Sequence, residues 1–169
     1  ARSPQPTSEI TDPATRVVAL FDTFKGHLRE TTLPKDPRDV RKLAAQVVGG
    51  DPTTYTDEIS DAIEAALTDA VDQHASYRAQ LAEGQRLETL LPRAARSLEK
   101  TDLQQFSTPL PIAVSAARAA DVQPGDVVLE PTAGTGHLVA AVDPSIATIQ
   151  VMELAPRRAR LLEALGYQV

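Results

Sequence analysis

The residues of this chain that could do chemistry centre on a glycine-rich segment, residues 127–136, with the sequence VVLEPTAGTG. Its first three residues form an apolar run typical of a buried parallel strand. Gly134 and Gly136 follow where a helix would begin. Glycine lets a ligand approach the backbone closely, because it has no side chain in the way. The pattern predicts a ligand-binding turn between a strand and a helix, although a tight turn without a ligand could carry the same glycines.

The acid inside this segment narrows the choice of ligand. The dinucleotide fingerprint G-x-G-x-x-G requires a third glycine at position 139, where this chain has Val139. Glu130 ends the predicted strand, and a diphosphate at the helix N-terminus would sit poorly beside its carboxylate. An acid in this position suits a ligand that carries an ammonium group. Alternatively, Glu130 could be a structural acid that caps the following helix.

A second acid, Glu153, ends the next predicted strand, 17 residues after Gly136. In open α/β sheets an acid in this place accepts hydrogen bonds from ribose hydroxyls. Its two oxygens match the two hydroxyls of an adenosine ribose. The alternative for Glu153 is a solvated strand end with no ligand.

A polar loop, residues 104–109 (QQFSTP), lies just upstream of these acids. Residues 104–111 (QQFSTPLP) followed by 129–136 (LEPTAGTG) resemble the class I S-adenosylmethionine (SAM) dependent methyltransferases. They are similar to N6-adenine DNA methyltransferases, in which (Y/F)-x-T-P precedes (D/E)-P-x-x-G-x-G. More narrowly, they resemble the methyltransferase-like segment of strawberry-notch-type methylase/helicase proteins of phages and plasmids. The resemblance covers roughly residues 100–169.

The resemblance implies a SAM site formed by Phe106, Thr108, Glu130, Pro131, Gly134, Gly136, Glu153 and Leu154. Glu130 would face the amino group of SAM, directly or through water. Gly134 and Gly136 would allow close backbone approach beneath the methionine and ribose. Glu153 would bind the ribose hydroxyls, and Leu154 or Met152 would lie against the adenine ring.

The resemblance also implies roles for two residues of the polar loop. Phe106 and Thr108 would close over the ligand, and Thr108 would offer its hydroxyl to the carboxylate of SAM. Phe106 could equally be a residue that packs one domain against another. His137 has no partner at metal-ligand spacing, so neither a metal site nor a Ser-His-Asp triad is predicted.

The chain departs from the family at the catalytic motif. The (N/D/S)-P-P-(Y/F) loop, whose aromatic ring stacks on a flipped base, is absent, and the 169 residues contain no Pro-Pro pair. We therefore expect a fragment of a longer protein that holds the cofactor, has no catalytic residue of its own, and would contact DNA through a missing C-terminal part. Two alternatives remain open: a non-catalytic structural or interaction module of a phage or mobile-element assembly, and a methyltransferase that acts on protein or a small molecule.

The helices and strands that would position these residues indicate a chain in three parts with an α/β fold. Residues 1–13 are expected to form a flexible tail, 14–100 a helical region, and 101–169 the truncated first half of a Rossmann-like SAM-dependent methyltransferase fold. The last part is predicted as helix 109–120, strand 127–129, helix 138–142, strand 148–152, helix 156–165, and the start of a third strand at 166–169.

The helical region begins at Asp12-Pro13, a sequence typical of a helix N-terminus. Pro34 and Pro37 are expected to end its first helix, and residues 40–47 to form a second. Apolar positions from Ile59 to Leu81 recur by three and four and predict one long helix, which Gly84 could interrupt. That apolar stripe could be an ordinary buried face or a docking surface for a partner protein. The arginines of residues 157–160 are predicted to form a solvated face.

Composition limits the remaining functions. A formal charge of −6 argues against a chain that coats nucleic acid by general electrostatics. The chain has no cysteine, which excludes disulfides and thiolate metal sites and fits a reducing compartment such as the cytoplasm. No stretch approaches the roughly 20 apolar residues needed to cross a bilayer, so no membrane partner is expected.

Overall fold

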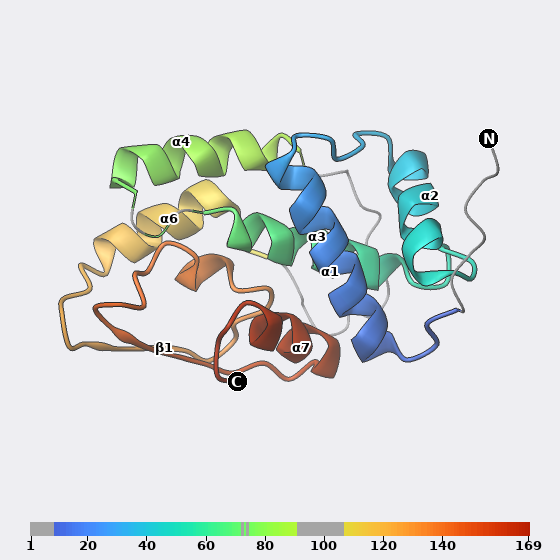
Figure 1. Ribbon diagram of the computed structural model, residues 1–169. Helices are drawn as coiled ribbons and strands as arrows, with labels where there is room; N and C mark the ends of the chain where they lie inside the picture. The colour runs from blue at the N-terminus through green and yellow to red at the C-terminus, as the bar shows by residue number, and fades with distance from the viewer. Residues whose placement is uncertain (1–8, 72, 74, 91–106) are drawn as a thin grey trace.

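The computed structural model describes residues 9–71, 73, 75–90 and 107–169. This part of the chain is α/β and mostly helical, with a small parallel sheet (Figure 1). Its elements are α1 (Pro13–Arg29), α2 (Pro37–Val48), α3 (Thr56–Asp69), α4 (Tyr77–Glu88), α6 (Leu110–Ala119), β1 (Val127–Glu130), the 3-10 helix η1 (His137–Val139), β2 (Thr148–Val151) and α7 (Pro156–Ala164). None of the described helices is both long and apolar enough to span a bilayer.

The first two helices each begin with an aspartate followed by proline. Asp12 caps α1 and Pro13 takes its first position, which confirms the predicted start. Asp36 and Pro37 do the same for α2, so Pro37 both follows the end of α1 and begins the next helix. The Arg38 side chain, followed by its backbone N–H, lowers the pKa of Asp36 to about 2.

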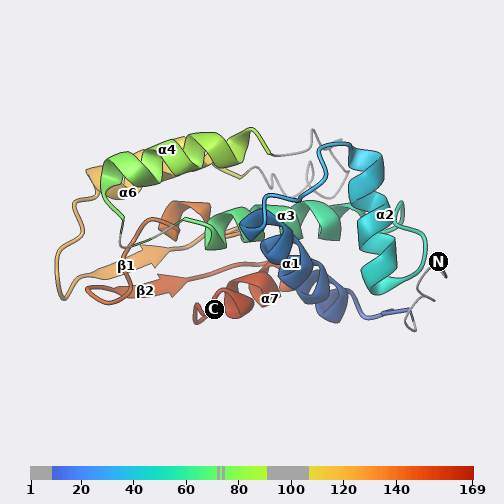
Figure 2. The ribbon, with the colours of Figure 1, turned by 45° about the horizontal axis from the view of Figure 1, so that its top comes forward.

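Helix α3 lies at the centre of the molecule, and α1 packs against it (Figures 1 and 2). Phe21 and Phe24 of α1 are buried with Ile63 and Leu67 of α3. Leu161 of α7 belongs to the same cluster of buried side chains. A single apolar core therefore joins the helical region to the α/β part.

The long helix predicted from the apolar stripe is wrong, because the structure divides it in two. Helix α3 ends at Asp69, and Ser76 caps the separate helix α4 through a hydrogen bond to its side chain. Gly84 lies inside α4 and does not interrupt it. A Cβ atom at Gly84 would lie 3.4 Å from the Leu110 backbone, so glycine allows α6 to pack closely against α4.

The sheet consists of β1 and β2 side by side in parallel, at the end of the molecule away from α2 (Figure 2). Val127 lies opposite Thr148, and Glu130 lies opposite Val151. Both strands occur where the sequence predicts them, to within one residue. Their parallel pairing brings the ends of the two strands together, which is the arrangement the predicted site requires.

Two predictions for the α/β part are wrong. The helix expected at 138–142 is the shorter 3-10 helix η1, which begins directly after the left-handed Gly136. Residues 166–169, expected to start a third strand, are not in a strand. Instead, the Tyr167 N–H donates to the Leu162 carbonyl at 3.0 Å and closes the end of α7.

The two faces of the sheet differ in burial. Val128 and Val151 face a small apolar cluster that contains Leu162 of α7. Val127 and Leu129 point to the other face and are 64% and 57% exposed. Among the described residues, α7 and the segment around η1 therefore cover one face of the sheet and leave the other open.

The arginines at the start of α7 form a buried ion-pair cluster and not the predicted solvated face. The Arg157 Nε lies 2.8 Å from one oxygen of Asp61, and the Arg158 Nη2 lies 3.0 Å from the other. Asp61 of α3 is fully buried and Arg158 is 3% exposed. Only Arg160 matches the prediction, because it is exposed and pairs with Glu163 of its own helix. Asp61 supplies the counter-charge that allows the first two arginines to be buried.

Candidate functional site

The glycine turn, residues 131–136, connects β1 to η1. Gly134 and Gly136 have φ angles of +58° and +89°, in the left-handed region that glycine adopts without a steric penalty. The Gly136 N–H donates to the Ala133 carbonyl at 2.8 Å, which closes the turn. The backbone conformation therefore favours glycine at both positions.

The surroundings of the two glycines are different. A Cβ atom at Gly136 would lie 3.3 Å from both Leu162 of α7 and Thr68 of α3, so this glycine is packed inside the protein. At Gly134 the nearest atom would be the Arg158 Nη1, at 3.6 Å, which is ordinary contact. Close approach of a ligand therefore suits Gly134, whereas the packing of α3 and α7 accounts for Gly136.

Glu153, just after β2, directly contacts the glycine turn. Its Oε2 accepts a hydrogen bond from the Gly134 N–H at 2.8 Å, and its Oε1 accepts one from the Ala155 N–H at 2.8 Å. The side chain is half-buried and links the turn to the N-terminus of α7. Glu153 is therefore not a freely solvated strand end.

Glu130 lies on the neighbouring strand end and contacts an earlier part of the same turn. Its Oε1 accepts hydrogen bonds from the backbone N–H and the hydroxyl of Thr132, at 3.0 and 3.1 Å. The Met152 N–H donates to the Glu130 carbonyl at 2.9 Å, so the two acids project from adjacent strand ends. Glu130 and Glu153 thus bind positions two residues apart on one turn, and neither is in an ion pair with a residue that the structure describes.

The loop that precedes α6 also reaches this turn. The Thr108 carbonyl lies 2.7 Å from the Nδ1 of His137, the first residue of η1. The hydroxyl of Ser107 donates to the Oε2 of Glu64 in α3. Both loop residues are half-buried. Phe106, the aromatic residue predicted to close over the ligand, lies outside the described residues.

The other predicted residues are exposed near the turn. Pro131 is exposed at its start. Leu154, directly after Glu153, is 87% exposed, and Met152 is 58% exposed. Such exposure leaves an apolar surface beside Glu153 that a flat ring could cover.

Three residues that the sequence analysis did not assign to the site also lie there: Glu64, Thr68 and His137. The Thr68 hydroxyl donates to the Thr135 carbonyl at 2.9 Å, and the Thr135 hydroxyl lies 3.4 Å from the Glu64 Oε2. Helix α3 therefore contacts the glycine turn directly. No local motif marks Glu64 or Thr68, because their contacts join residues about 70 positions apart in the chain.

His137 is buried at the centre of these contacts. Its Nδ1 faces the Thr108 carbonyl, and its Nε2 lies 3.2 Å from the Glu64 carbonyl. A neutral imidazole donates to only one of these oxygens, whereas an imidazolium donates to both. The ring thus lies within hydrogen-bonding distance of both the loop and α3, directly after the glycine turn. The sequence analysis did not predict this position, because His137 has no potential partner near it in the chain.

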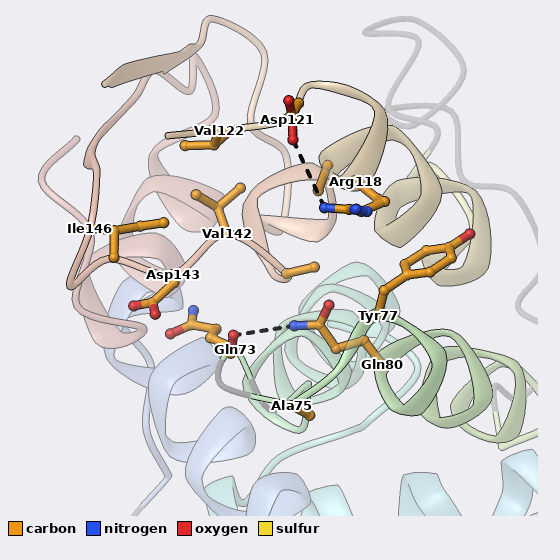
Figure 3. A pocket seen from close by; sticks show the side chains of 12 residues that line it. Gln73, Ala75, Tyr77, Gln80, Arg118, Asp121, Val122, Val142, Asp143 and Ile146 are labelled. Atoms are coloured by element: carbon orange, nitrogen blue, oxygen red, sulfur yellow. Dashed lines mark hydrogen bonds and ion pairs between the residues drawn. The ribbon is translucent and has the colours of Figure 1, made fainter. Parts of the chain in front are cut away.

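A separate pocket of about 210 Å³ lies between α4, the end of α6 and the segment before β2 (Figure 3). Gln80 and Val142 line it, and Gln80 donates to the Gln73 carbonyl at 3.3 Å. At its rim, Arg118 and Asp121 pair with each other at 3.9 Å. The predicted cofactor-binding residues that the structure describes do not line this pocket.

No protein family, curated protein or solved structure matches this chain.

Proposed function

We propose that this chain forms the cofactor-binding part of a SAM-dependent methyltransferase, of the type that methylates an amino nitrogen of a DNA base. One observation carries the proposal. The acid after the second strand, Glu153, is directed at Gly134 of the turn after the first strand, 2.8 Å from its N–H. In parallel α/β folds this is the position where an acid binds the ribose of an adenosine ligand.

The hydrogen-bond capacity of Glu153 fits this ligand. Each of its oxygens accepts one N–H bond from the protein, and a carboxylate oxygen has two acceptor sites. One site on each oxygen is thus available for a ribose hydroxyl, which is a donor. Glu153 can therefore accept hydrogen bonds from the protein backbone and from a bound ligand at the same time.

The other predicted residues surround the same turn. Glu130 places a negative charge at the neighbouring strand end, which suits an ammonium group and disfavours a diphosphate. Thr108 belongs to the loop that contacts His137, and Leu154 offers an exposed apolar side chain beside Glu153. When bound, SAM would supply the electrophilic methyl group. The chain has no Pro-Pro pair, so we assign to it the binding of the cofactor and not of the methyl acceptor.

Isothermal titration calorimetry with S-adenosylhomocysteine, the demethylated product of SAM, tests the proposal. We expect saturable binding to the wild-type chain, and none of NAD, whose diphosphate Glu130 would repel. Glu153→Gln, which removes the charge and half of the acceptor capacity, should weaken binding at least tenfold, or about 1.4 kcal/mol. Glu163→Gln on the exposed side of α7 is the matched control and should bind as the wild type does.

Two results would contradict the proposal. Absence of S-adenosylhomocysteine binding to a chain whose thermal unfolding is cooperative would favour a structural or interaction module. Equal binding by Glu153→Gln and the wild type would remove Glu153 from the ligand site.

A further inference from the structure

Helix α3 places a buried hydroxyl group against the middle of the glycine turn. Thr68 is 4% exposed, and its hydroxyl donates to the Thr135 carbonyl at 2.9 Å. The hydroxyl also lies 3.3 Å from the Glu64 carbonyl of its own helix, but it has one proton and the Thr135 oxygen is nearer. Thr135 is itself 1% exposed, so loss of this donor would leave a buried carbonyl without its hydrogen bond.

The segment around Thr135 needs such a contact because it lies between two glycines. Gly134 and Gly136 have no Cβ atom and therefore restrict the backbone less than other residues do. The bond from the Gly136 N–H to the Ala133 carbonyl closes the turn on itself, whereas the Thr68 bond attaches the turn to another element. Thr68 thus limits the positions that the turn can take relative to α3.

From this contact we propose that Thr68 is a positioning residue of the cofactor site, which acts through the glycine turn on Glu153. The Gly134 N–H, one residue before Thr135, is the donor that holds the Oε2 of Glu153 at 2.8 Å. A turn that is fixed by Thr68 keeps this N–H directed at the carboxylate. The inference rests on the function proposed above and adds to the site a residue of the helical region.

Helix α3 also fixes the second donor to Glu153. That donor is the Ala155 N–H, just before α7, and α7 is attached to α3 through the ion pair of Arg158 with Asp61 at 3.0 Å. Asp61 and Thr68 are seven residues apart, about two helical turns, so they lie on one side of α3. Both N–H groups that hold Glu153 are therefore attached to one face of this helix. A carboxylate held in this way loses little conformational entropy when it binds a ribose.

The test compares three variants of the full chain by calorimetry with S-adenosylhomocysteine. Thr68→Val replaces the hydroxyl with a methyl group, and we expect it to bind about fivefold more weakly, the effect of one lost hydrogen bond. Thr68→Ser keeps the hydroxyl and should bind as the wild type does. Thr23→Val is the matched control, because the Thr23 hydroxyl donates to the Ala19 carbonyl of its own helix, and it should also bind as the wild type does.

Amide hydrogen exchange, measured without ligand, separates positioning from general stability. In Thr68→Val the Gly134 amide should exchange at least about fivefold faster than in the wild type, because its contact with Glu153 opens more often. The Met152 amide, which donates to Glu130 at the end of the sheet, should keep the wild-type rate. If Thr68→Val does not fold, Thr68→Ala removes the hydroxyl without an added methyl group and carries the same expectations.

Wild-type affinity without the Thr68 hydroxyl would overturn the inference, and so would a loss that Thr68→Ser shares in full. An unchanged exchange rate at Gly134, or equally faster exchange at Gly134 and Met152, would show that Thr68 does not act on Glu153 through the turn. These results would leave the proposed function intact. Failure of the wild type to bind S-adenosylhomocysteine would instead overturn the proposed function and the inference with it.

Discussion

At the residue scale, the two glycines of the turn differ in their surroundings, although both have the same type of backbone conformation. Gly134 and Gly136 both have positive φ angles, yet only Gly136 is enclosed by Leu162 and Thr68. The sequence predicts a bend at these positions but does not distinguish a glycine needed for a ligand from one needed for packing. That distinction depends on α3 and α7, which are remote in the chain.

Alanine substitutions separate the two glycines. Gly136→Ala should lower the free energy of unfolding by about 1–3 kcal/mol, because the alanine would have a strained φ angle and its Cβ atom would lie only 3.3 Å from Leu162 and Thr68. Gly134→Ala, where the added methyl group has room, should cost only about 1–2 kcal/mol for the left-handed conformation. Urea denaturation measures both values. A larger loss for Gly134→Ala would contradict the packing described for Gly136.

At the element scale, the attachment of α7 to α3 depends on charge. Asp61 is fully buried between Arg157 and Arg158, so the two helices share one ion-pair cluster in addition to apolar contacts. Because the N–H of Ala155, the residue before α7, donates to Glu153, this attachment also helps to position the acid that contacts Gly134.

Removal of that buried charge should be costly. Asp61→Asn removes the carboxylate that pairs with Arg157 and with the buried Arg158, and it should lower the free energy of unfolding by about 3–5 kcal/mol. Asp39→Asn breaks the exposed pair with Lys42 and should cost at most about 1 kcal/mol. Chemical denaturation followed by circular dichroism compares the two variants. Similar small losses would mean that the cluster does not stabilise the fold.

The elements themselves were predictable to different degrees. Local signals were sufficient for the start of α1 at Asp12 and for both strands, since caps and apolar runs act over a few residues. The break between α3 and α4 was not predicted, because the apolar period continues across it. Ser76 was the available signal, as a residue type common at helix starts. The buried arginines were missed for a different reason: their partner Asp61 lies 96 and 97 positions away.

At the scale of the whole molecule, the helical region is part of the structure around the glycine turn. The predicted boundary at residue 100 separates segments that share one apolar core, from Phe21 of α1 to Leu161 of α7. The site also draws residues from both sides of this boundary. The acids at the strand ends could be predicted from their spacing, whereas the contacts of Glu64 and Thr68 with the turn could not. Contacts between distant segments determine those positions, and a single sequence does not contain them.

The central claim is that an adenosyl ligand binds at the turn between β1 and η1. A titration of the isotope-labelled chain with S-adenosylhomocysteine, followed by amide chemical shifts in NMR spectra, tests this claim most directly. We expect the largest shifts at the amides of Gly134 and Glu153, with smaller shifts at Thr108. Absence of shifts at millimolar ligand, or shifts confined to the pocket around Gln80 and Val142, would contradict the account.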